Sequence, residues 1–139
     1  MNPPTVLLER TFVAALIDPA DPDHQSAARC YLELVDEFGR DERLLTVTSH
    51  TRRALGAAGD DVLAPAATLH VAGQERHAAQ HVRLDGLDGL DGLGGLGEEA
   101  GGDLALNLVL LHRHRIAAVA TFDRRYHAFD VDVLPGSTD

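Results

Sequence analysis

Short apolar runs alternate with longer helix-like segments along this chain, and that alternation restricts its fold more than any other feature. The runs are residues 5–8, 44–48, 116–120 and 131–134. Residues 116–120 are continuously apolar, which is typical of strands buried on both faces, as in parallel sheets. Strands separated by helices favour an α/β sandwich around a mostly parallel sheet. We expect one such domain over residues 1–139.

Helices are expected between these strands. In residues 23–38 the apolar positions recur three and four apart, so one face is buried and Gly39 ends the helix. Ser49 can cap a helix that ends near Gly56 or Gly59. The remaining expected helices are residues 12–17, pieces of 60–83 broken near Pro65 and Gly73, residues 103–115, and residues 123–129.

The segment 84–102 repeats the triplet Asp-Gly-Leu and then becomes rich in glycine and glutamate. Because glycine makes ordering of the backbone costly, we predict a flexible loop within the domain. A calcium repeat is not expected, since leucine occupies positions where further oxygen ligands would be needed.

Charge and composition restrict the classes of function. The formal net charge is −10, and half of it comes from the five acidic residues of segment 84–102. An acidic body argues against tight, non-specific binding of nucleic acid. The single cysteine, Cys30, permits no internal disulfide and is expected to be a small buried helix residue. The chain shows no apolar stretch long enough to cross a membrane and no signal peptide, so we expect a cytoplasmic protein without a membrane partner.

Three acids are candidates for chemistry. Glu9 ends the first strand, Asp123 follows the strand at 116–120, and Asp103 stands at the expected start of a helix. If the two strands are neighbours, Glu9 and Asp123 lie at the same sheet edge, where open α/β folds bind their ligands. Clustered carboxylates repel one another unless a cation compensates them, and Mg²⁺ or Mn²⁺ fits such oxygen ligands. A bound ion could then orient water toward a phosphodiester.

Each acid also has a structural explanation that the sequence leaves open. Asp103 and Asp123 are both suited to cap a following helix. Glu9 can pair at the surface with Arg10 or Arg52. No nucleophilic serine elbow, Walker loop or dinucleotide-binding glycine pattern is present in the sequence.

Four passages resemble the PIN domain, a family common among bacterial toxin-type ribonucleases. Val6-Leu-Leu-Glu9-Arg-Thr-Phe12 is similar to its opening strand, and Asp23-His24-Gln-Ser-Ala27-Ala28 to its second helix. Leu45-Thr-Val-Thr48-Ser49 is similar to its second strand. The most specific match runs from Asp103 through Thr121-Phe122-Asp123 to Pro135. The resemblance implies a PIN-like three-layer α/β/α sandwich.

The resemblance also implies a site. The family hydrolyses single-stranded RNA with Mg²⁺ or Mn²⁺, using typically four acids. Here the resemblance assigns metal binding and catalysis to Glu9, Asp103 and Asp123, with Thr11 and Thr121 in support. The arginines that it places near RNA are Arg10, Arg52, Arg53 and Arg124.

Two departures from the family pattern weaken the expected activity. The first acid is Glu9 where the family has aspartate, which displaces the carboxylate by one methylene. The acid expected near Ala54 or Leu55 is absent, and Arg52 and Arg53 precede that position. A guanidinium there could neutralise the remaining acids and make the metal unnecessary, or could contact RNA phosphate.

We therefore expect a degenerate member of this family with weak or no nuclease activity. Two alternatives remain: an active toxin-type ribonuclease, and a non-catalytic module that binds RNA, a ribosome or a protein. The family also implies an antitoxin or other protein partner and a homodimer.

Overall fold

The computed structural model describes residues 3–71, 97–129 and 131–135. The chain forms two compact units, one of residues 1–70 and 117–139 and the other of residues 71–116. Most of the predicted flexible loop, residues 84–96, lies outside the described residues.

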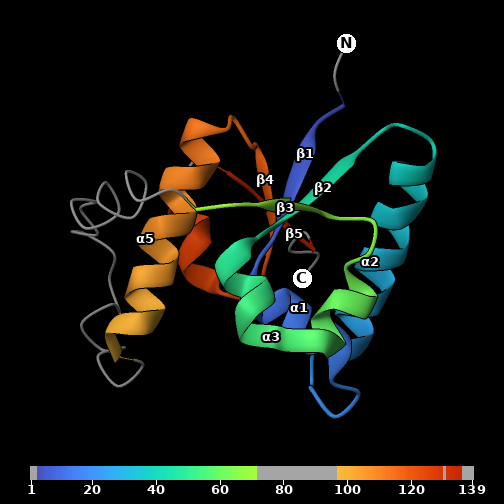
Figure 1. The fold of residues 1–139 in the computed structure, drawn as a ribbon, viewed down its shortest axis with the longest axis horizontal. Helices are drawn as coiled ribbons and strands as arrows, with labels where there is room; N and C mark the ends of the chain where they lie inside the picture. The colour runs from blue at the N-terminus through green and yellow to red at the C-terminus, as the bar shows by residue number, and fades with distance from the viewer. Residues whose placement is uncertain (1–2, 72–96, 130, 136–139) are drawn as a thin grey trace. The chain divides into compact units, whose positions relative to one another are not determined.

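The first unit is built on a parallel sheet of five strands with the order β3-β2-β1-β4-β5 (Figure 1). The strands are β1 (Thr5–Leu8), β2 (Leu44–Thr48), β3 (Ala67–Leu69), β4 (Ala118–Ala120) and β5 (Asp132–Leu134). β1 is central, and Val6, Leu7 and Leu8 are fully buried, as its unbroken apolar sequence predicts. All four predicted strands are confirmed.

The prediction for residues 60–83 was wrong where β3 forms. Ala67–Leu69 is an edge strand that pairs in parallel with β2, not a piece of helix. The Thr46 hydroxyl on β2 also donates to the Ala67 carbonyl at 3.0 Å. Three residues are too few to show the alternating hydrophobic pattern of a strand. β3 is stabilised by its pairing with β2.

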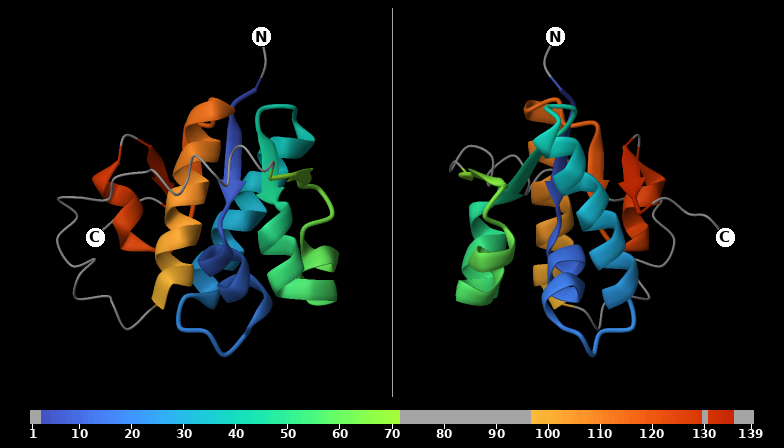
Figure 2. Two further views of the ribbon diagram at one scale, coloured as in Figure 1. Left: turned by 60° about the vertical axis from the view of Figure 1, so that its left-hand side comes forward. Right: turned by 90° about the vertical axis from the view of Figure 1, so that its right-hand side faces the viewer.

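Three α-helices and a short 3₁₀ helix complete the first unit: α1 (Arg10–Ile17), α2 (His24–Gly39), α3 (Ser49–Val62) and η2 (Arg124–Ala128). α1 packs against α2 and α3, and both of these also contact β2 (Figure 2). In the described part of the chain, every helix is too short or too polar to cross a lipid bilayer.

The start and end of α3 differ from the prediction. The cap is Thr48, whose hydroxyl accepts from the Thr51 amide at 3.2 Å, while Ser49 is the first helical residue. Residues Ser49–Val62 are two helical stretches that meet at a kink at Gly56. There the backbone takes φ 65° and ψ −152°, a non-helical conformation open to glycine, so the first stretch ends near Gly56, at one of the two predicted ends, and the second continues to Val62.

The second unit contains α5 (Gly97–Arg113). The helix begins six residues before the predicted start at Asp103, so residues 97–102 are helical and not part of a loop. Glycine inside a helix costs only about 1 kcal/mol relative to alanine, so Gly101 and Gly102 need not end it. Asp103 therefore stands inside the helix, and the alternative that it caps the N-terminus is wrong.

The core of the first unit joins α1 and α2 to the sheet. Phe12 and Val13 of α1, Ala27 and Leu34 of α2, and Val6 of β1 are all buried in one cluster. Cys30 is 8% exposed, as predicted, and burial raises the pKa of its thiol to about 11. A thiol with so high a pKa remains protonated at neutral pH and is a poor nucleophile.

Candidate acidic site at the sheet edge

The carboxyl ends of β1 and β4 meet, as the sequence predicts for neighbouring parallel strands. Leu8 of β1 lies opposite Ala120 of β4 in the register. One residue further on, the Glu9 amide donates to the Ala120 carbonyl at 2.9 Å. The chain thus places Glu9 beside Thr121, and Asp123 follows two residues later.

Glu9 is buried, with 5% of its surface exposed. Its Oε1 atom accepts from the Thr11 amide at 2.7 Å, from the Thr11 hydroxyl, and from the Thr121 hydroxyl at 2.9 Å. Burial raises the pKa of the Glu9 carboxyl above its ordinary value, the two threonines oppose that rise, and the charge of Asp123 adds to it. The alternative of a surface ion pair for Glu9 is wrong, because the side chain does not reach the surface.

The two threonines join the strand ends. The Thr121 hydroxyl donates to Glu9 and accepts from the Asp123 amide at 2.9 Å. The Thr11 hydroxyl lies 3.1 Å from that of Thr121 and accepts from the Phe122 amide at 2.9 Å. Both threonines therefore contact the acids or the backbone between them, and their role in support of a catalytic site stays a prediction.

Asp123 is paired with Arg125, which is not among the site residues predicted from the sequence. Its Oδ2 accepts from Nη2 of Arg125 at 2.6 Å, and Nε of the same guanidinium lies 2.9 Å from Oδ1 and 3.1 Å from Oδ2. The Arg125 amide also donates to Oδ1 at 3.0 Å. Asp123 thus caps η2, as its structural alternative predicts. Hydrogen bonding to Asp123 raises the pKa of Arg125 further above its ordinary value.

The described acids do not by themselves supply a metal centre. Among the residues that the structure describes, no group of three or more histidines, cysteines, aspartates or glutamates could hold a metal ion. The Oε1 atom of Glu9 accepts three hydrogen bonds, and both oxygens of Asp123 contact Arg125. Because Asp103 belongs to the other unit and its side chain is not among those described, its predicted share in the site remains a prediction.

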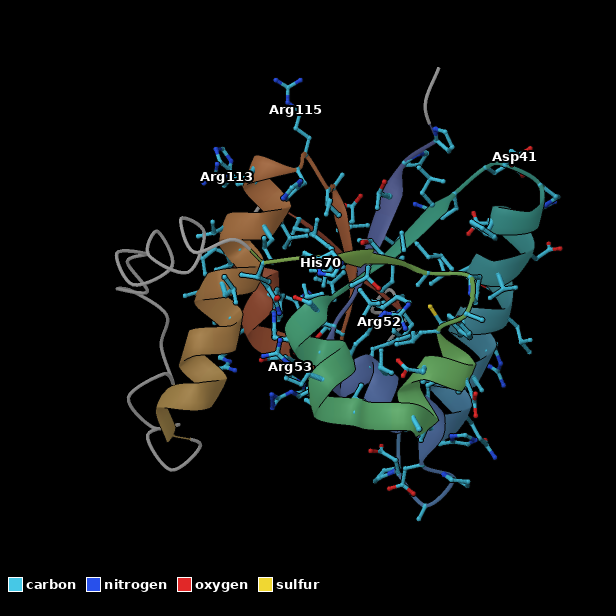
Figure 3. The ribbon with its side chains drawn as sticks, in the orientation of Figure 1. Asp41, Arg52, Arg53, His70, Arg113 and Arg115 are labelled. Carbon is cyan, nitrogen blue, oxygen red and sulfur yellow. The ribbon has the colours of Figure 1, made fainter. Side chains whose placement is uncertain are left out.

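The predicted RNA-binding arginines have different surroundings. Arg52 donates to the carbonyls of Leu63 and Ala66 at 3.2 and 2.9 Å, and its side chain is 21% exposed. Arg53 and Arg124 are exposed, and Arg10 is half-buried. Figure 3 shows Arg52 and Arg53 on α3. Arg52 therefore stabilises the C-terminal end of α3 by these two hydrogen bonds, and its predicted contact with RNA stays a prediction.

Replacing Arg52 with methionine is expected to lower the free energy of unfolding by about 2 kcal/mol, because two carbonyls lose a charged donor. The matched control is Arg53→Met, which removes the same charge from an exposed neighbour and is expected to cost no more than about 0.5 kcal/mol. Urea denaturation followed by circular dichroism measures both. Equal effects of the two substitutions would show that Arg52 does not secure α3.

A groove of about 1300 Å³ lies between α2 and the segment that follows β4. Thr121 and Phe122 line it beside the acids, and Arg29 and Arg124 line it further along. Neither arginine makes an ion pair with another described residue. The groove also contains acids, Asp23, Glu33 and Glu37, of which Glu37 is paired with Arg43 at 3.4 Å.

The order of the elements and the parallel sheet define the PIN-like α/β/α sandwich, and the predicted fold class is confirmed. A solved structure with a similar fold is the sarcin-ricin loop cleaving toxin VapC20 of Mycobacterium tuberculosis. The TM-score is 0.57 with 16% identity, over 92% of this chain and 98% of that one. At such low identity the likeness concerns the fold alone. No protein-family model and no curated protein matches the chain.

Proposed function

We propose that this chain is a PIN-like domain that binds single-stranded RNA and has weak or no metal-dependent ribonuclease activity. The observation that carries the proposal is the Asp123–Arg125 pair. An acid whose two oxygens are held by a guanidinium in a partly buried site is poorly available to Mg²⁺ or Mn²⁺. One oxygen of Glu9 is engaged as well, because Oε1 accepts hydrogen bonds from Thr11 and Thr121.

Support for RNA binding comes from the groove beside the acids. Arg29 and Arg124 lie exposed along it, and guanidinium groups suit contacts with phosphate. Phe122 is half-buried at the same place with its ring stacked on Phe12, and a base would stack on the part of the ring that lines the groove. Since the relative VapC20 cleaves the sarcin-ricin loop, an RNA with that loop is the first ligand to test. An antitoxin-like protein partner and a homodimer in the cytoplasm belong to the same proposal.

RNA binding is tested by fluorescence anisotropy with a single-stranded RNA and with a sarcin-ricin stem-loop. Arg124→Gln is expected to weaken binding several-fold and to reduce its salt dependence, because one phosphate contact is lost. The control is Arg40→Gln, which removes the same charge from a residue paired with Asp36 and Glu42 outside the groove. Absence of RNA binding would favour the alternative of a protein-binding module.

Cleavage is tested with the same RNAs in Mn²⁺, for the unaltered chain and for Asp123→Asn and Asp103→Asn. We expect cleavage close to background in all three proteins. Metal-dependent cleavage that disappears in both variants would overturn the proposed loss of activity and establish the active toxin-type ribonuclease.

A further inference from the structure

Arg125 meets the Asp123 carboxylate along its edge. The guanidinium contributes two nitrogens, Nε and Nη2, at 2.6 to 3.1 Å from the two carboxylate oxygens. Only 14% of the arginine side chain and 15% of the aspartate side chain are exposed. A two-nitrogen pair that is largely shielded from water is stronger than a solvated surface ion pair.

A divalent ion would need the same oxygens. Mg²⁺ binds carboxylate oxygens at about 2.0 to 2.1 Å and holds few protein ligands, so each available oxygen matters. On Asp123, Oδ1 accepts from the Arg125 amide and Nε, and Oδ2 accepts from Nε and Nη2. Direct coordination of an ion therefore requires the guanidinium to move away.

Arg125 and a divalent ion would compete for the Asp123 oxygens, and Arg125 is favoured because it is covalently tethered to Asp123. Arg125 follows Asp123 by two residues, at the start of η2, and its own amide already bonds to the carboxylate. A tethered group acts at a high effective concentration, whereas a free ion must supply the whole cost of its capture. The neighbouring acid is only a partial substitute, since Oε1 of Glu9 is held by two threonines.

We propose that Arg125 is the resident cation of this site: its guanidinium neutralises Asp123 and excludes divalent ions, and Asp123 becomes a metal ligand only when Arg125 is removed. This inference deepens the proposed function and rests on it, because it explains why a PIN-like site would work without metal. It assigns to Arg125 the neutralising role that the sequence suggested for Arg52 and Arg53.

The test is titration of the full chain with Mn²⁺ alone, by calorimetry or by the loss of the free Mn²⁺ signal in electron paramagnetic resonance. The unaltered chain is expected to bind weakly. Arg125→Gln is expected to bind at least about tenfold more tightly, because the ion no longer displaces a charge-assisted pair. Arg40→Gln, which removes the same charge from an exposed residue, is expected to bind like the unaltered chain. The double variant Asp123→Asn with Arg125→Gln is expected to lose the gain.

Three results would overturn the proposal: tight binding by the unaltered chain, no gain in Arg125→Gln, or a gain that persists in the double variant. If Arg125→Gln does not fold by circular dichroism, Arg125→Lys replaces it. Lysine keeps the charge but not the two-nitrogen geometry, so a several-fold gain is expected and equal affinity would overturn the proposal. Since no RNA is present, failure here concerns Arg125 and the reason given for weak metal-dependent activity, whereas failure of the anisotropy experiment concerns the proposed RNA binding.

Discussion

Replacing Phe12 with alanine is expected to lower the free energy of unfolding by about 3 to 5 kcal/mol, as for other fully buried aromatic residues. Phe12 is 0% exposed, near the start of α1. Its ring stacks on that of Phe122, with the centroids 5.9 Å apart and the planes at 16°. The substitution therefore removes core contacts and an aromatic pair together.

The loss is expected to extend to the acidic site, because Phe122 stands between Thr121 and Asp123. The Phe122 amide donates to the Thr11 hydroxyl, which is itself bonded to Glu9. Urea denaturation measures the stability of Phe12→Ala. The control is Leu32→Ala, a substitution at a side chain that is 70% exposed, and it is expected to change the free energy of unfolding by no more than about 0.5 kcal/mol. Similar effects of the two substitutions would show that the aromatic pair does not anchor this edge.

The strands of the sheet were predictable because the central strands are rich in apolar residues, with β4 continuously apolar. β1, β2 and β4 lie between other strands, and buried strands need apolar residues on both faces. β3 gives no such signal, because an edge strand of three residues depends on the backbone of β2. Its existence follows from the sheet beside it and not from its own residues.

The ends of the helices were less predictable for a local reason. Thr48 and Ser49 are both good capping residues, and the choice between them depends on where β2 stops. Gly56 has the sequence signature of a helix end, and the first stretch of α3 stops there, but a second helical stretch follows at once and runs to Val62. Gly101 and Gly102 likewise precede Asp103 without breaking α5.

Of the candidate site, the part that depends on strand order was predictable and the part that depends on side-chain orientation was not. Parallel pairing of β1 with β4 brings Glu9 to Thr121, as the positions of the strands imply. Arg125 was missed because a spacing of two residues matches no helical neighbour, and a 3₁₀ turn was needed to fold it back. Arg52 reaches carbonyls 11 and 14 residues ahead, which no local pattern reveals.

Replacing Thr121 with valine is expected to cost about 2 to 3 kcal/mol at neutral pH, in the range for a lost hydrogen bond to a charged group. Thr121 is 3% exposed, and valine keeps its shape but leaves both Glu9 and the Asp123 amide without its hydroxyl. The matched control is Thr46→Val, also buried, which loses a bond between two neutral groups and is expected to cost about 1 kcal/mol.

The cost of Thr121→Val should depend on pH with a definite sign. The pKa of Glu9 is higher in the folded chain than its ordinary value of 4.5, so the folded state binds the proton more tightly. The stability that this tighter proton binding contributes is fully present below pH 4.5 and is lost as the pH rises through the pKa of Glu9 in the folded chain. Valine removes a bond that favours the ionised carboxylate, which raises that pKa further and enlarges the loss of stability at high pH.

Thermal unfolding of both proteins at pH 4 and pH 7 should therefore show a larger difference at pH 7. In a Glu9→Gln background, which carries no charge at this position, the pH dependence of the Thr121→Val cost should disappear, and its persistence would place the titrating group elsewhere.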